Sequence, residues 1–193
     1  MRYSGQPSWQ MWVSSPQGLL VGLYVREAAG MRPATAVDLP PLDPPVELRA
    51  GLAPLAVPEA ARQWVRWWEG ELARQEGPER GFFAPDRRFD GEELGALVHA
   101  CYDDAHRWAA LSCHDEDQAH LDGEGGSGAE GDLVRAVEAE LGRKARPFRL
   151  TVTQLPLADA VGWRPSPHHL LVSRALRSDP DAYARWLTPV LRE

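Results

Sequence analysis

Residues 58–76 read PEAARQWVRWWEGELARQE, the most regular pattern in this chain of 193 residues. Proline is favoured at the first position of an α-helix, and Pro58 opens the stretch. The apolar residues that follow recur three and four positions apart, as expected for one face of an amphipathic helix: Ala61, Trp64, Val65, Trp68 and Leu72. The pattern therefore predicts a helix over residues 58–76 whose tryptophan-rich side faces a core.

The chain before this helix has a different character. Residues 9–14 and 18–26 are rich in aromatic and β-branched types and are separated by a turn-forming Ser-Pro-Gln, which predicts an N-terminal β-hairpin. Prolines then recur too closely for any helix or strand, so residues 28–57 are expected to form an extended connector. Its larger apolar side chains still need burial against the body: Leu39, Leu42, Val46, Leu48 and Leu52.

Two further helices and an acidic segment follow. Residues 91–112 place seven small or apolar side chains, including Cys101, on one face, which predicts a second amphipathic helix. Residues 114–132 hold seven carboxylates and five glycines and no lysine or arginine, which favours a flexible acidic loop. A third helix is expected from about residue 133 to Leu141, and Gly142 is placed to end it.

The last quarter of the chain supplies strands and a final helix. Apolar and polar residues alternate from Phe148 to Thr153, the pattern of a half-buried strand, and residues 169–174 indicate a more buried one. Asp179 and Pro180 predict the start of a helix. The element order indicates an α+β fold in one domain, residues 1–193. We expect a mostly antiparallel sheet of about four strands, with N-terminal and C-terminal hairpins, covered by three to four amphipathic helices.

Charge and cysteine usage limit the class of partner and the compartment. The net charge is −7, and no long basic stripe is present to follow a phosphate backbone, so a nucleic-acid partner is not expected. The apolar run from Leu19 to Val25 is too short to span a bilayer, which argues against membrane insertion. Cys101 and Cys113 are twelve residues apart on a predicted helix, about 18 Å, too far for a disulfide. Reduced thiols favour the bacterial cytoplasm.

One histidine pattern raises the possibility of a metal site. His99, Asp103 and His106 follow one another at helical spacing, so they share a face of the second helix. Two imidazoles and a carboxylate can bind a transition metal, which would make the protein a small metal-dependent hydrolase. The same face lies opposite the apolar one and points to solvent, which favours an ordinary polar surface.

Two other groups of residues stand out as candidate sites. Trp163, His168 and His169 surround the entry to the buried C-terminal strand, where one imidazole could face a pocket at the end of the sheet. Trp67 lies at the edge of the buried helix face, and with Phe82 and Phe83 it could anchor a protein interface. The alternative for Trp67 is that the proline-rich connector covers it within the same chain.

No catalytic residue and no cofactor can be assigned from the sequence. The chain contains no GxSxG nucleophile motif, no GxxxxGK[ST] phosphate loop and no HExxH metal motif. We therefore expect a non-enzymatic cytosolic interaction, regulatory or accessory protein that acts through a protein partner or self-association. The alternative is an enzyme that uses a histidine and carboxylate site assembled only in three dimensions.

Overall fold

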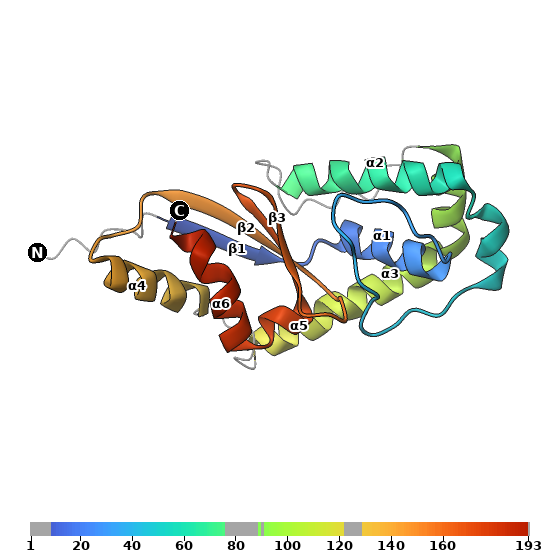
Figure 1. The fold of residues 1–193 in the computed structure, drawn as a ribbon. Coiled ribbons are helices and arrows are strands. Elements are labelled where there is room, and N and C mark those ends of the chain that lie inside the picture. Colours follow the sequence, from blue (N-terminus) through green and yellow to red (C-terminus); the bar gives the residue numbers. More distant parts are fainter. Residues whose placement is uncertain (1–8, 76–88, 90, 122–128, 193) are drawn as a thin grey trace, which may run out of the picture.

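The computed structural model describes residues 9–75, 89, 91–121 and 129–192. The molecule is elongated, with helical layers at one end and a sheet at the other (Figure 1). The helical end contains α1 (Gln17–Ala28), the 3-10 helix η1 (Ala50–Leu55), α2 (Pro58–Gln75) and much of α3 (Glu92–Leu121). The other end contains β1 (Trp9–Ser14), β2 (Phe148–Leu155), β3 (Gly162–Ser166), β4 (His169–Ser173), α4 (Ala129–Leu141), α5 (Arg174–Arg177) and α6 (Pro180–Leu191).

The sheet is mixed, and most of its pairings are parallel. Its strand order is β1-β2-β4-β3, in which β1 and β4 both run parallel to β2 and only β3 pairs antiparallel, with β4. The α+β class and the four strands are confirmed, but the prediction of a mostly antiparallel sheet is wrong. The half-buried character predicted for residues 148–153 is also wrong. Because β2 is an interior strand, it is buried on both faces from Leu150 to Leu155.

The predicted N-terminal hairpin is wrong, and the C-terminal hairpin is present but joins β3 and β4 instead of the two strands expected there. Residues 17–28 form α1, so no second strand follows β1. After β2 the chain pairs with the connector instead of turning back: the backbone N–H of Asp43 donates to the Pro156 carbonyl at 3.0 Å, and that of Ala158 donates to the Pro41 carbonyl at 2.9 Å. β2 pairs instead with two parallel neighbours, β1 and β4, and parallel pairs need long crossover connections. The one hairpin of the described sheet joins β3 and β4.

Helix α1 is buried all round, which explains why its sequence resembles a strand. Leu19, Leu20, Leu23 and Val25 are fully buried. A continuous apolar run of this kind has no helical periodicity, because every side faces other residues. Gly22, in the middle of α1, lies against α2, where its carbonyl accepts a hydrogen bond from Nε1 of Trp64 at 2.8 Å.

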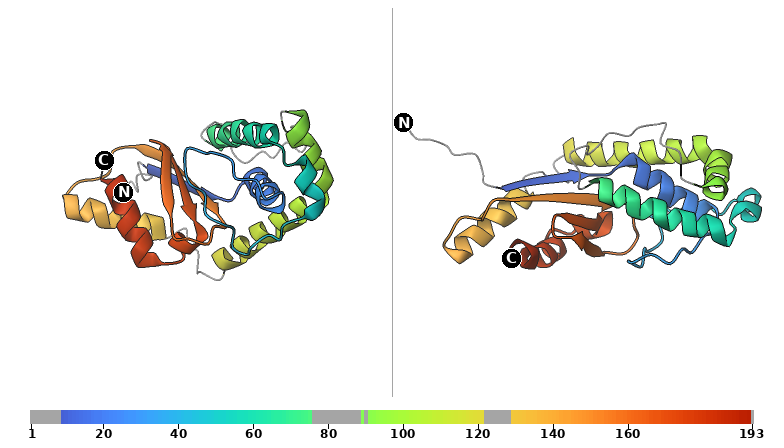
Figure 2. Two further views of the ribbon diagram at one scale, coloured as in Figure 1. Left: turned by 45° about the vertical axis from the view of Figure 1, so that its right-hand side comes forward. Right: turned by 90° about the horizontal axis from the view of Figure 1, so that it is seen from above.

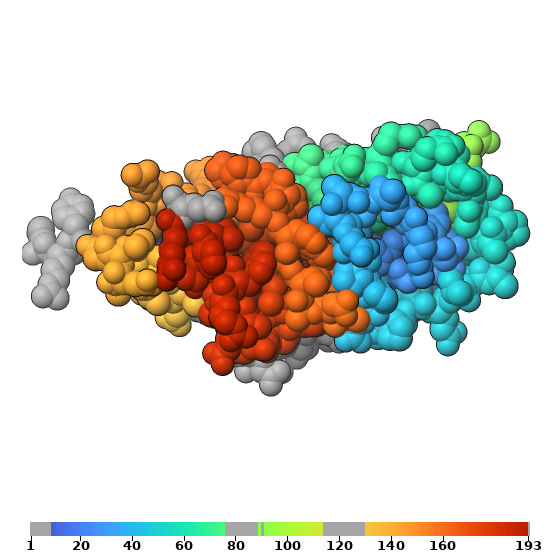
Figure 3. Space-filling view, in the orientation of Figure 1, coloured from blue at the N-terminus to red at the C-terminus, as the bar shows by residue number. Residues whose placement is uncertain are grey.

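The proline-rich segment runs over α1 at the front of the molecule (Figure 3). Residues 29–49 contain no helix or strand, and η1 follows them. Arg26, buried in α1, holds this segment by donating to the Leu39 carbonyl at 3.4 Å and to the Pro40 carbonyl at 3.0 Å. Of the apolar residues expected to need burial, Leu48 is the exception, because it is 71% exposed. The other four are buried or partly buried.

The two long helices differ in how well the sequence predicted them. The helix expected over residues 58–76 is confirmed as α2. α3 begins as expected but continues to Leu121, with a break at Cys101 where φ is −131°. The loop expected over residues 114–132 is therefore wrong at both ends, since α4 already begins at Ala129. The glycines of this segment begin only at Gly123, and the residues before it tolerate a helix.

Helices α4 and α6 cover one face of the sheet (Figure 2). Leu150, Val152, Leu170 and Val172 pack there in one core cluster with Tyr183, Leu187 and other side chains. Gly142 ends α4 with a φ of +63°, as its position predicted. The predicted cap of α6 is also confirmed, because the Asp179 carboxylate accepts the backbone N–H groups of Asp181 and Ala182.

Candidate functional site

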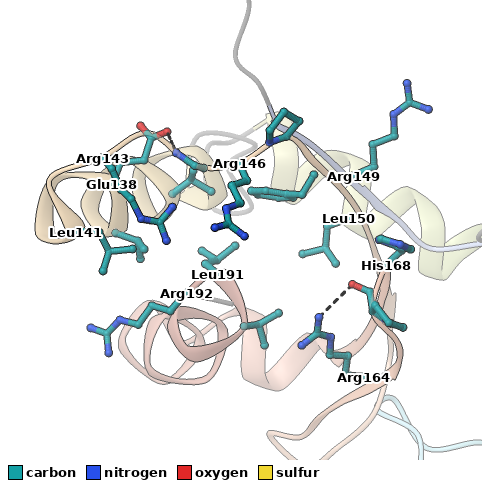
Figure 4. A pocket seen from close by; sticks show the side chains of 17 residues that line it. Glu138, Leu141, Arg143, Arg146, Arg149, Leu150, Arg164, His168, Leu191 and Arg192 are labelled. Carbon is teal, nitrogen blue, oxygen red and sulfur yellow. Dashed lines mark hydrogen bonds between the residues drawn. The ribbon is translucent and has the colours of Figure 1, made fainter.

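A pocket of about 340 Å³ lies between α4, α6, the start of β2 and the turn between β3 and β4. Figure 4 shows side chains from all of these segments around it. We call it the arginine pocket, and its lining consists of Val134, Val137, Glu138, Leu141, Arg143, Ala145, Arg146, Pro147, Phe148, Arg149, Leu150, Arg164, Pro167, His168, Val190, Leu191 and Arg192.

The floor of the arginine pocket is aliphatic. Val137 comes from α4, Leu150 from β2 and Leu191 from the last turn of α6. Val137 and Leu150 are largely buried, whereas Leu141 at the end of α4 is 42% exposed. The apolar surface of the core therefore continues outward to solvent at this pocket, where a ligand can cover it.

The rim of the arginine pocket is strongly cationic. Five arginines and one histidine line it, against a single carboxylate, that of Glu138. This carboxylate accepts the backbone N–H of Ala145 and the ammonium of Lys144, each at 2.9 Å. The backbone N–H donor and then the Lys144 ammonium lower the pKa of Glu138. Glu138 is therefore ionised but already paired, and the rim carries a net positive charge within a chain of net charge −7.

The arginines of the rim differ in their partners. Arg164 donates to the Pro167 carbonyl at 3.2 Å, and Arg192 donates to both carboxylate oxygens of Glu140 at 2.7 Å. The side chains of Arg143, Arg146 and Arg149 form no hydrogen bond or ion pair with any residue that the structure describes. In Figure 4 the Arg146 guanidinium lies over the pocket, whereas that of Arg149 points away from it. Arg146 is thus the cation best placed for a ligand inside.

The segment that carries these arginines is held in place. Glu138 ties its backbone to α4 through the N–H of Ala145. Pro147 restricts the backbone of Arg146 to extended conformations. α4 and α6 both end beside the pocket, and their dipoles stabilise cations there. Arg146 is therefore presented without a large loss of backbone freedom on binding.

The three residues predicted to surround a pocket at the sheet end do not lie together. His168 is exposed and lines the arginine pocket. His169 is fully buried, with its Nε2 atom 2.8 Å from Oγ1 of Thr153. Trp163 is half-buried and packs against the core cluster of the helical end. Only His168 therefore belongs to the site that the structure shows.

The predicted metal-binding residues do not converge either. His99 and Asp103 are exposed, and the ring of His106 packs against Tyr102 with centroids 4.1 Å apart. The break at Cys101 falls between His99 and Asp103 and interrupts the helical spacing on which the hypothesis relied. Among the described residues, no three His, Cys, Asp or Glu side chains are grouped as a metal site requires.

The residue predicted as an interface anchor is mostly covered within the chain. Trp67 is 9% exposed and packs on Phe89, with ring centroids 4.9 Å apart, and on Trp64, at 6.4 Å. Trp64 also stacks on Trp68 at 5.1 Å, which completes a tryptophan cluster. It is α1, at Gly22, that meets the Trp67 ring. Phe82 and Phe83 lie outside the described residues.

Sequence analysis missed the arginine pocket although part of its signal is visible. Residues 143–149 contain four cations among seven residues, directly after α4. That run fits the usual preference of cations for a helix C-terminus, so it does not by itself indicate a site. Arg192, at the end of α6, also lines the pocket, but only the fold brings it near residues 143–149.

Comparisons of the chain with protein-family models, curated protein sequences and solved structures find no match. In the described part of the chain, no helix is both long and apolar enough to cross a lipid bilayer. The class that the fold and the site define is therefore an α+β protein with an aliphatic pocket under an arginine rim.

Proposed function

We propose that this protein is a non-enzymatic cytosolic interaction protein that binds an anionic, partly apolar ligand in the arginine pocket. The observation that carries the proposal is the combination of an open aliphatic floor with five arginines and only one, already paired, carboxylate. An arginine gains most from a carboxylate or phosphate, because its planar donors match the acceptor oxygens in pairs.

The chemistry of the lining favours binding over catalysis. General acid–base or nucleophilic catalysis needs a reactive side chain and a partner that activates it. The described lining contains no serine, threonine, cysteine, tyrosine or lysine, and its one carboxylate is held in an ion pair. Apart from the arginines, His168 and Glu138 are the only ionisable side chains of the described lining.

The state of the cysteines is consistent with the cytosolic part of the proposal. Cys101 is buried in α3, Cys113 is half-buried near Ser15, and both are free thiols. Proteins of oxidising compartments commonly use their cysteines in disulfides, whereas cytosolic ones keep them reduced.

Titration with anilinonaphthalenesulfonate tests the proposal, because this fluorescent probe joins apolar rings to one sulfonate. We expect saturable binding, and Arg146→Glu should weaken it by at least about tenfold by placing a like charge over the pocket. Arg185→Glu is the matched control, since Arg185 is exposed on α6 outside the pocket and the change in charge is the same.

Equal binding of the probe to the parent protein and to Arg146→Glu would contradict the proposal. So would a loss of probe binding in Arg185→Glu but not in Arg146→Glu. Thermal unfolding of both variants, followed by circular dichroism, verifies that each remains folded. This check matters because the probe also binds partly unfolded states.

A further inference from the structure

We infer that the ligand of the arginine pocket is an acidic segment of a partner protein, which inserts one apolar side chain and lays its carboxylates on the surrounding arginines. This inference rests on the proposed function, because it names the class of ligand for the same site. Four features of the pocket favour a peptide.

The first feature is the size and chemistry of the pocket floor. A volume of about 340 Å³ is near the lower end of the roughly 300–1,000 Å³ of small-molecule sites. The floor, formed by Val137, Leu150 and Leu191, is aliphatic. A floor of this kind suits a single leucine or phenylalanine side chain of an otherwise extended chain.

The second feature is that the positive charge extends beyond the pocket. Arg149 and Arg192 point away from its centre in Figure 4, and Lys144 is 87% exposed. A ligand confined to the pocket cannot reach all three. A peptide that crosses the mouth can, while its apolar side chain fills the floor. Its carboxylates would then meet the Arg149 side chain directly and would share Arg192 with Glu140 and Lys144 with Glu138.

The third feature is the charge of the rest of the protein. The chain has seven more acidic than basic residues, yet the rim of this pocket is cationic. An acidic partner is therefore attracted to this rim, whereas the excess of acidic residues in the rest of the chain repels it. A long polyanion such as nucleic acid, or an anionic bilayer, would instead meet repulsion over much of its contact area.

The fourth feature is the shape and composition of the surface. Single-stranded nucleic acids bind on rows of aromatic side chains, but the described lining contains one aromatic residue, Phe148. Proteins that lie on a bilayer insert a projecting apolar face. Here the apolar surface is recessed between α4 and α6, so it receives a projecting side chain.

Fluorescence anisotropy with a dye-labelled short peptide tests the inference. The peptide consists of aspartates and glutamates around one central phenylalanine, and its control carries serine at that position. We expect saturable binding that is at least about tenfold weaker for the serine peptide, because the anchor is lost. Arg146→Glu should weaken binding at least about tenfold as well, and Arg185→Glu should leave it unchanged.

Binding should also weaken as salt rises from about 50 mM to about 300 mM, because screening shortens the reach of the rim charges. Arg149→Glu supplies a further test, since it should weaken the peptide but not anilinonaphthalenesulfonate. If the probe binds at the pocket and the peptide does not, this inference fails while the proposed function stands. If neither binds, both fail.

Three other outcomes would overturn the inference. The first is equal binding of the phenylalanine and serine peptides, which would leave only a charge effect. The second is tighter binding, lost in Arg146→Glu, to phosphatidylglycerol vesicles or to a labelled single-stranded oligonucleotide. The third is a dimer of the protein alone that Arg146→Glu dissociates, since a second copy would then occupy the pocket.

Discussion

The packing of Trp67 against α1 gives the sharpest test of the fold. A Cβ atom added to Gly22 would overlap the six-membered ring of Trp67, so this glycine is required by close approach and not by its backbone angles. Trp67→Ala removes a buried indole and should lower the free energy of unfolding by about 3–5 kcal/mol. Trp12→Ala, at a tryptophan that is 38% exposed, should cost only about 1 kcal/mol.

The effect of Gly22→Ala depends on whether the indole is present. Overpacking against Trp67 should cost up to about 3 kcal/mol, while replacing glycine within a helix returns about 1 kcal/mol. The net loss expected in the parent protein is therefore about 2 kcal/mol. In Trp67→Ala the added methyl enters vacant space, so the same change should be neutral or stabilise by up to about 1 kcal/mol. The coupling between the two positions is then about 2–3 kcal/mol.

Urea unfolding followed by circular dichroism measures all four proteins of this cycle. Additive effects of Gly22→Ala and Trp67→Ala would refute the proposed contact. A Trp67→Ala protein that is as stable as the parent but has lost self-association would refute the intramolecular role of Trp67. It would restore the interface role that its sequence position suggested.

Three further predictions concern other parts of the fold. Arg177→Ala should lower the free energy of unfolding by about 3–5 kcal/mol in urea melts, because it leaves Glu130 as a buried charge without its ion-pair partner. Glu130 is 4% exposed and lies 3.0 Å from Arg177. Adding Glu130→Gln should recover part of the loss. Asp179→Ala should cost about 1 kcal/mol in thermal melts through loss of the α6 cap, whereas an unchanged melting temperature would contradict that role. Burial raises the pKa of the Cys101 thiol to about 11, so the native state keeps this proton at a pH where the unfolded chain has lost it. The free energy of unfolding should therefore fall from about pH 9 to about pH 11, by up to about 1.4 kcal/mol per pH unit. Cys101→Ala should reduce that fall.

Residues with strong local signals were predicted well from the sequence. Pro58 and the tryptophan spacing indicated α2, Gly142 indicated the end of α4, and Asp179 indicated the start of α6. In each case the physical cause is local: a missing backbone donor, a left-handed backbone angle or a capping carboxylate. Such causes act within a few residues and can be read from the chain directly.

Features that depend on distant partners were not predicted. α1 resembles a strand because its whole circumference is buried, and the parallel sheet pairs β2 with β1, which lies more than a hundred residues away in the sequence. The arginine pocket was not predicted from the sequence for the same reason. Arg146 and Leu191 are far apart in the sequence and meet only because α4 and α6 end beside one another.

Hydrogen exchange of backbone amides with and without anilinonaphthalenesulfonate tests the central claim most directly, because it locates the ligand. We expect exchange to slow in residues 134–150 and 187–192, where α4, β2 and α6 border the arginine pocket, and to stay unchanged in α2. At the same probe concentration, Arg146→Glu should show clearly less slowing in both regions. Protection confined to α2 around Trp67, or no protection at saturating probe, would contradict a binding role for the pocket.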